Sequence, residues 1–177
     1  MLQASGEPGV NAVLTGLRLR PYAEADLEFL CQVYRATRAE EMALTGWSPP
    51  QIEAFLRDQF RLQRHHYETY YTGAAFDVIE LDGQPIGRLY VHRGPKELRV
   101  MDISLLPEFR GRGLGTFLLS GLIAEAQAKR QSVTLHVEFN NPARALYHRL
   151  GFTQQGELQG VYIPMTLPPP AIATEPA

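Results

Sequence analysis

The sequence predicts an α/β (α+β) fold: one domain with a mixed central sheet of six to seven strands, flanked by about four helices. A hairpin signal, Asp82-Gly83, joins the strand-like runs 75–81 and 85–93, which predicts antiparallel neighbours. Residues 98–138 then read as strand, glycine-rich loop, helix and strand, the order of a right-handed crossover between parallel strands. The length of 177 residues suits a single domain.

The first part of the chain reads as a strand followed by two helices. Residues 17–21 alternate like a strand that ends at Pro21. Apolar residues then recur at helical spacing over residues 24–42. Ser48, followed by two prolines, predicts the N-cap and first turn of a second helix, whose apolar residues continue to Phe60.

The crossover unit supplies the fourth strand, over residues 98–106, and the fifth, over residues 133–138. A helix from the glycine loop to about Arg130 connects them. Its predicted apolar face consists of Leu114, Phe117, Leu118, Leu122, Ile123 and Ala126.

The last elements follow from capping and turn signals. Asn141 before Pro142 predicts a helix start, and Gly151 predicts its C-cap after residue 150. Residues 152–157 and 161–167 then read as a closing hairpin.

Composition limits the class of protein. We expect a flexible tail over residues 1–13, a folded domain over 14–167 and a proline-rich disordered tail over 168–177. A net charge of −2 gives no general attraction to nucleic acid. No signal peptide or membrane span is visible, so a cytoplasmic location without a membrane partner is expected. The lone Cys31 falls on an apolar helical stripe and reads as core.

The strand, glycine-rich turn and helix start at residues 102–115 form a candidate phosphate site, because free N–H groups at a helix start favour an anion. A P-loop would need Lys and Ser or Thr after the last glycine, but Thr116 and Phe117 follow Gly115. A dinucleotide fingerprint would need its third glycine where Thr116 or Leu118 stands. Both of these nucleotide-binding patterns are therefore disfavoured.

Two segments resemble the GCN5-related N-acetyltransferase (GNAT) superfamily. Arg-Gly-Arg-Gly-Leu-Gly at residues 110–115, preceded by Leu-Pro-Glu-Phe, is similar to the family's pyrophosphate loop. Residues 134–152 are similar to its next unit, a strand, an Asn-Pro-Ala helix start and Tyr-x-x-x-Gly-Phe. The resemblance implies that residues 14–167 form an acetyltransferase domain that uses acetyl-CoA as cosubstrate and needs no metal.

The resemblance also implies a set of cofactor contacts. The pyrophosphate would lie on the amides of residues 111–116 beside two arginines, and the pantetheine arm on main-chain groups of the fourth strand. Asn141 or its neighbour Asn140 would contact the same arm. The full set is Ile103, Ser104, Leu105, Arg110, Gly111, Arg112, Gly113, Leu114, Gly115, Thr116, Asn140, Asn141 and Tyr147.

By the same resemblance, Tyr147 is the general acid that protonates the departing thiolate. Its helical stripe also allows an ordinary core position. The base that deprotonates the amine is open. His136 and Asp102 are candidates, and a water chain is the alternative.

The acceptor is a primary amine that the sequence does not identify: a small molecule, a protein N-terminus or a lysine. Trp47, Glu40 and Glu41, the tyrosines at 67, 70 and 71, and Tyr162 are candidates for its site, although core packing or a solvated helix face explains them as well. A homodimer is a candidate assembly, because dimers are common among relatives. The alternative function is a CoA-binding sensor or interaction module of the same fold.

Overall fold

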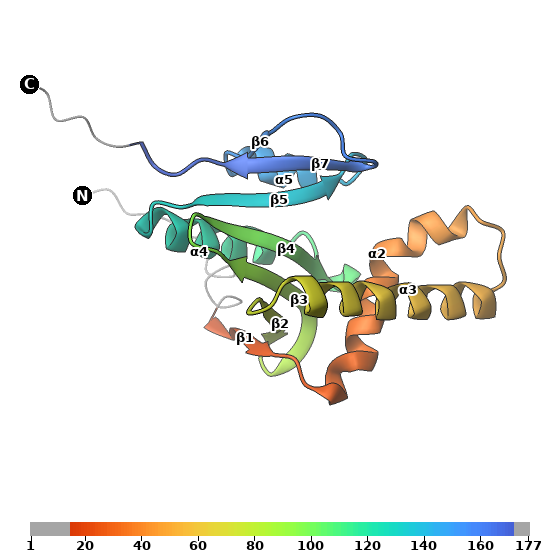
Figure 1. The fold of residues 1–177 in the computed structure, drawn as a ribbon. Coiled ribbons are helices and arrows are strands. Elements are labelled where there is room, and N and C mark those ends of the chain that lie inside the picture. Colours follow the sequence, from red (N-terminus) through yellow and green to blue (C-terminus); the bar gives the residue numbers. More distant parts are fainter. Residues whose placement is uncertain (1–14, 172–177) are drawn as a thin grey trace, which may run out of the picture. The chain divides into compact units, whose positions relative to one another are not determined.

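The computed structural model describes residues 15–171 and confirms the predicted fold class. Seven strands form one mixed sheet in the order β1-β2-β3-β4-β5-β7-β6, and four α-helices flank it (Figure 1). The predicted tail over residues 1–13 lies outside the described residues, as do residues 172–177 of the C-terminal one. The elements are β1 (Leu17–Pro21), η1 (Glu24–Asp26), α2 (Leu27–Ala43), α3 (Pro49–Tyr70), β2 (Ala75–Leu81), β3 (Gln84–Arg93), β4 (Glu97–Leu105), η2 (Pro107–Phe109), α4 (Leu114–Ala128), β5 (Ser132–Glu138), α5 (Ala143–Arg149), β6 (Thr153–Gln154) and β7 (Tyr162–Leu167).

The described residues group into two compact units. The first comprises residues 15–90 and 102–115, and the second comprises residues 91–101 and 116–171. Strand β4 contributes its beginning to the second unit and its end to the first. The two units are described in turn.

In the first unit, β1 and β2 pair antiparallel from Leu17 with Leu81 to Pro21 with Asp77. The turn between β2 and β3 has φ of 52° at Asp82 and 79° at Gly83. Positive φ at both central residues is the conformation of a type I′ hairpin, so the predicted turn is confirmed.

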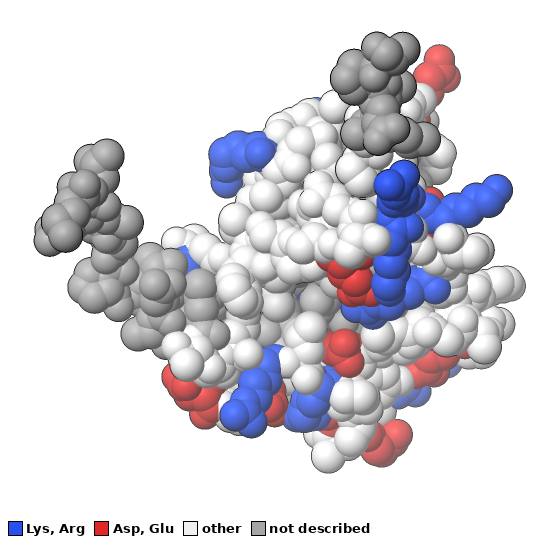
Figure 2. All heavy atoms as spheres, turned by 90° about the vertical axis from the view of Figure 1, so that its left-hand side faces the viewer, with Lys and Arg blue, Asp and Glu red and all other residues white. Residues whose placement is uncertain are grey.

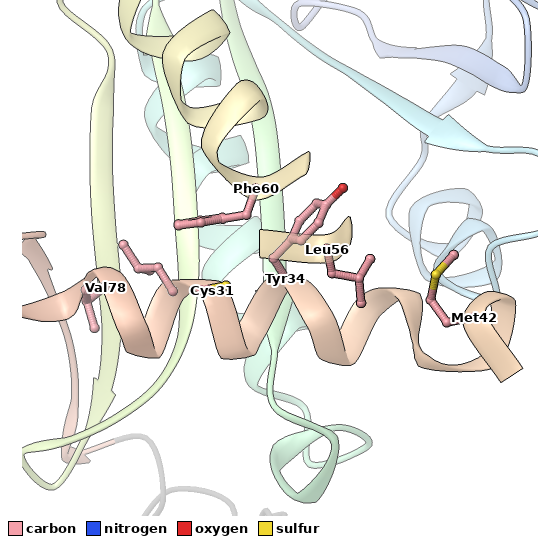
Figure 3. Packing of buried hydrophobic residues seen from close by; sticks show 7 residues of the cluster. Cys31, Tyr34, Met42, Leu56, Phe60 and Val78 are labelled. Carbon is pink, nitrogen blue, oxygen red and sulfur yellow. The ribbon is translucent and has the colours of Figure 1, made fainter. Parts of the chain in front are cut away.

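Helices α2 and α3 pack on each other and cover one core cluster of this unit (Figure 1). Figure 3 shows Tyr34 directed from α2 toward α3, with Phe60 above Cys31. The cluster consists of Leu30, Cys31, Tyr34, Met42, Leu56, Phe60 and Val78. Cys31 is 2% exposed, which confirms its core position. Ser48 caps α3 as predicted, since Gln51 Oε1 accepts a hydrogen bond of 2.9 Å from its backbone N–H.

In the second unit, the beginning of β4 pairs parallel with β5, from Glu97 with Ser132 to Val100 with Leu135. Strand β7 runs antiparallel to β5, and the two arrows point in opposite directions in Figure 1. Strand β6 then pairs with β7 at the edge. Parallel and antiparallel pairs thus meet on either side of β5.

Two predicted details of this half of the chain are wrong. Phe117 is 48% exposed, whereas Leu119 is 1% exposed. At 100° per residue, Phe117 lies about 100° from Leu118 and about 140° from Leu122 around the helix axis, beyond one edge of the buried stripe of α4. The strand predicted over residues 152–157 is only two residues long, because its partner β7 contains Pro164, which has no N–H, and Gly156 turns the chain with φ of 79°.

Basic and acidic side chains are interspersed on the face drawn in Figure 2, in keeping with the net charge of −2. Within residues 15–171, no helix is both long and apolar enough to cross a membrane.

Candidate active site

The glycine-rich loop lies in the first unit, between η2 and the start of α4 at Leu114. Gly111 and Gly113 are exposed and have φ of 70° and 79°. A Cβ atom at either position would meet nothing within 4 Å. The loop therefore needs glycine for its backbone conformation and not for space. The first N–H groups of α4 have no acceptor within a helix and can bind an anion.

Both arginines of the loop have a contact close by. Arg110 Nε donates a hydrogen bond of 2.9 Å to the carbonyl oxygen of Leu105, the last residue of β4. The Arg112 guanidinium lies 5.2 Å from the centre of the Phe109 ring. A guanidinium carries five N–H donors, so one such contact leaves donors for a phosphate.

The end of β4 carries the predicted pantetheine contacts. Ile103, Ser104 and Leu105 are half-buried. Ser104 Oγ donates a hydrogen bond of 2.7 Å to Asp102 Oδ1, and both side chains lie on the same side of the strand. The pairing of β4 with β5 ends at Val100, and β4 continues for five residues beyond it.

Asp102, one of the predicted bases, forms an ion pair with Arg88 of β3. Arg88 Nη2 lies 2.8 Å from Oδ2, and Nε lies 3.2 Å from Oδ1. With the Ser104 hydroxyl, three donors therefore face this carboxylate. Accepting a proton would weaken these charge-assisted hydrogen bonds.

Sequence reasoning missed Arg88, which is 1% exposed. Its guanidinium lies 5.7 Å from the Tyr34 ring centre and 5.0 Å from that of Tyr90, and Nη2 also donates to Gln63. Burial works against the charge, but the neighbouring Asp102 carboxylate keeps the pKa of Arg88 above its usual range. An arginine within the apolar run of β3 was the signal, since buried charges are rare unless paired.

In the second unit, α5 begins at Ala143 with Pro142 at the N-cap position, one residue later than the predicted start at Asn141. Asn141 Oδ1 accepts a hydrogen bond of 2.9 Å from the Ala143 N–H, and its carbonyl accepts one of 3.1 Å from Arg144. Asn140, the alternative cofactor ligand, is exposed. Gly151, with φ of 96°, ends the helix. The side-chain oxygen of Asn141 thus stabilises the helix start, and its contact with the cofactor stays a prediction.

Tyr147, the predicted acid, is the buried residue of α5, with 8% exposure. Its ring packs edge-on against Phe152, with ring centres 5.9 Å apart. The aromatic ring is therefore fixed by packing, which both the catalytic interpretation and the core interpretation require.

His136, the other predicted base, lies on β5 beside Arg99. Arg99 Nη2 is 2.7 Å from His136 Nδ1. Because a guanidinium only donates, Nδ1 is the accepting nitrogen and the proton is assigned to Nε2. Partial burial, and then the positive charge of Arg99, lower the pKa of His136 below its usual range. The nitrogen that would take a proton therefore already accepts a hydrogen bond.

The residues predicted for the acceptor site have varied surroundings. Trp47, 44% exposed, packs edge-on against Phe55 with ring centres 5.2 Å apart. Tyr70 and Tyr162 are exposed, and Tyr67 contacts Tyr71 and Tyr90. Glu40 and Glu41 lie on an exposed helix face.

Within residues 15–171, no group of three or more His, Cys, Asp or Glu side chains is arranged to hold a metal ion.

Residues 34–152, more than half of the chain, match the Acetyltransferase (GNAT) family, and the chain belongs to this family. It is 32% identical over 92 residues to a putative [ribosomal protein bS18]-alanine N-acetyltransferase of Bacillus subtilis. It is 37% identical over 59 residues to the [ribosomal protein bS18]-alanine N-acetyltransferase of Haemophilus influenzae. These matches cover 50% and 33% of the chain, and 60% and 40% of the respective relatives. The chain thus spans less than two thirds of the length of either curated relative.

Solved structures share the fold. The PaiA N-acetyltransferase of Thermoplasma acidophilum, in complex with coenzyme A, has a TM-score of 0.65 at 20% identity and covers 86% of this chain and 98% of its own. An acetyltransferase of Thermus thermophilus has a TM-score of 0.62 at 22% identity and covers 86% and 96%. At these identities the likeness concerns the fold.

Proposed function

We propose that this protein is an acetyl-CoA-dependent N-acetyltransferase that acts by direct attack of a primary amine on the thioester in a ternary complex. The amine nitrogen forms a bond to the acetyl carbon, the carbon–sulfur bond breaks, and CoA leaves as a thiolate that takes up a proton. The observation that carries the donor assignment is the exposed loop with positive φ at Gly111 and Gly113, directly before the N-terminus of α4.

For the donor, we propose that the amides of residues 111–116 and the guanidinium groups of Arg110 and Arg112 bind the pyrophosphate. The pantetheine arm would bind to main-chain groups of residues 103–105. The side-chain amide of Asn141 or Asn140 would contact the same arm. The end of the β4–β5 pairing at Val100 supports this part of the proposal, because main-chain ligands must come from strand residues outside that pairing.

For the proton steps, Tyr147 is the proposed acid. A thiol has a pKa near 8.5 and a phenol one near 10, so the transfer is uphill by about 2 kcal/mol before positioning is counted. The packing of the ring against Phe152 supports a fixed hydroxyl position. Because His136 and Asp102 both accept from arginines, a water chain is the favoured route for the amine proton.

For the acceptor, we propose the α-amine of a polypeptide that begins with alanine as the first class to test. The names of the two curated relatives support it. Physical chemistry also supports it. At pH 7 about 10% of an α-amine with pKa near 8 is neutral, against about 0.04% of a lysine side chain. An enzyme without a strong base therefore favours the α-amine by roughly 200-fold.

The test is to incubate the full chain with acetyl-CoA and four amines, following free thiol and product mass. The amines are an alanine-initiated peptide, the same peptide with a blocked N-terminus and one lysine, a polyamine and a free amino acid. Preferred acetylation of the first peptide is expected. Faster acetylation of the blocked peptide at pH 7 would reject the α-amine as the acceptor class. The absence of turnover with every amine would count against the proposed acetyltransferase activity.

The arginine contacts of both candidate bases also motivate one alternative, a CoA-binding module without useful turnover. Tight CoA binding without transfer to any amine would favour it. We further propose a homodimer and a cytoplasmic location. The molar mass in solution, measured by light scattering, tests the homodimer.

A further inference from the structure

The buried Arg88 of β3 connects three other elements of the first unit. Its Nη2 donates to Gln63 of α3 at 3.0 Å and to Asp102 of β4 at 2.8 Å, and its guanidinium lies beside Tyr34 of α2. A buried charge is retained at little cost only when it is paired and hydrogen-bonded. The position of Asp102 is therefore tied to the core.

This tie extends to the next residue on the same side of β4. The Ser104 hydroxyl donates to Asp102 Oδ1 at 2.7 Å. Asp102 and Ser104 flank Ile103, so the peptide groups between them are held from both sides by the side-chain network. These peptide groups include the proposed main-chain contacts of the pantetheine arm.

Gly87, the neighbour of Arg88, brings the backbones of β3 and β4 together. A Cβ atom at Gly87 would lie 2.2 Å from the carbonyl oxygen of Ser104 and 3.1 Å from Leu105 Cα. Real Cβ atoms do not approach backbone atoms so closely, so only glycine allows this arrangement. One residue further, the Leu106 N–H donates to the carbonyl of Ile86 at 2.9 Å.

We propose that Gly87 and Arg88 are positioning residues that hold residues 102–105 of β4 in the conformation that receives the pantetheine arm. Gly87 sets how closely the β4 backbone approaches β3. Arg88 holds the side chain of Asp102, which in turn holds that of Ser104. This inference rests on the proposed use of acetyl-CoA, and neither residue touches the cofactor in it.

The first test compares Gly87→Ala with Gly121→Ala. A Cβ at Gly121 in α4 meets nothing within 4 Å, and that glycine has no positive φ. We expect Gly87→Ala to weaken CoA binding by at least about tenfold in calorimetry, with cooperative melting retained, while Gly121→Ala stays within about twofold. A folded Gly87→Ala protein with wild-type CoA affinity would overturn the proposal.

The second test replaces the ion pair by apolar side chains in the double variant Arg88→Met/Asp102→Leu. Because removing both partners leaves no unpaired buried charge, this variant is expected to fold. It should still bind CoA at least about tenfold more weakly, since Ser104 has lost its anchor. Wild-type affinity in a stably folded double variant would show that Arg88 is structural only.

A readout independent of CoA separates this inference from the proposed function. Amide hydrogen exchange at residues 103–105 should be faster in Gly87→Ala than in Gly121→Ala. If the wild-type protein does not bind CoA, the proposed function fails, while the exchange data still decide whether Gly87 holds β4. Unchanged exchange at these amides contradicts the positioning role in either case.

Discussion

Replacing Gly113 by alanine tests the donor site with little other disturbance. Gly113 is exposed, has φ of 79°, and has no atom within 4 Å of the place where a Cβ would be. The substitution therefore adds backbone strain without a steric clash. Gly46, in the connection between α2 and α3, has φ of 70° and equally open surroundings, which makes Gly46→Ala a matched control.

The strain of an L-residue in this left-handed conformation is roughly 1–2 kcal/mol. If the free loop keeps its conformation, this appears as lost stability, a fall in melting temperature of about 2–8 °C. If the free loop relaxes, the strain returns when CoA binds, and the affinity falls by roughly 5–30-fold. Because the same strain energy is divided between the two effects, a small loss of stability in Gly113→Ala implies a large loss of CoA affinity.

Calorimetric titration with CoA, together with thermal unfolding of both variants, measures the two parts. We expect Gly113→Ala to bind CoA several-fold more weakly than the wild-type protein, and Gly46→Ala to lose stability alone. If Gly113→Ala loses little stability and still binds CoA as tightly as Gly46→Ala does, residues 111–116 do not form the pyrophosphate site.

Three further predictions concern catalysis, the core and pH. Tyr147→Phe keeps the ring contact with Phe152 but should lower single-turnover acetylation by about 100-fold or more, and an unchanged rate rejects the acid role. Phe60→Ala in the α2–α3 core should lower the free energy of unfolding in denaturant titration by about 3–5 kcal/mol, and a loss below about 1 kcal/mol contradicts its core role. Hydrogen bonds from Arg20 lower the pKa of Asp26 from 3.8 to about 2, so their stabilisation is present above the unfolded pKa and is lost as pH falls through about 2. Melting temperatures from pH 5 to 2 should fall less steeply for Asp26→Asn, and parallel curves would exclude this linkage.

Local signals predicted most of the fold. The Asp82-Gly83 turn, the Ser48 cap and Gly151 each determine a conformation within a few residues, and all three occur where predicted. The errors concern features that depend on a neighbouring element distant in sequence. The length of β6 depends on Pro164 of its partner, and the buried face of α4 depends on which side meets the rest of the protein.

The donor and proton-transfer parts of the proposed site differ in the same way. A phosphate loop uses consecutive main-chain groups, so glycine spacing predicts a candidate anion site, and the family resemblance assigns it to acetyl-CoA. A base is defined by its surroundings, and these come from far along the chain: Arg99 is 37 residues from His136, and Arg88 is 14 from Asp102. Residue type predicted two candidate bases, His136 and Asp102, but each already accepts a hydrogen bond from a guanidinium. Under the proposed mechanism, the amine must therefore lose its proton without a strong base, and the pKa of the acceptor amine becomes a selecting property.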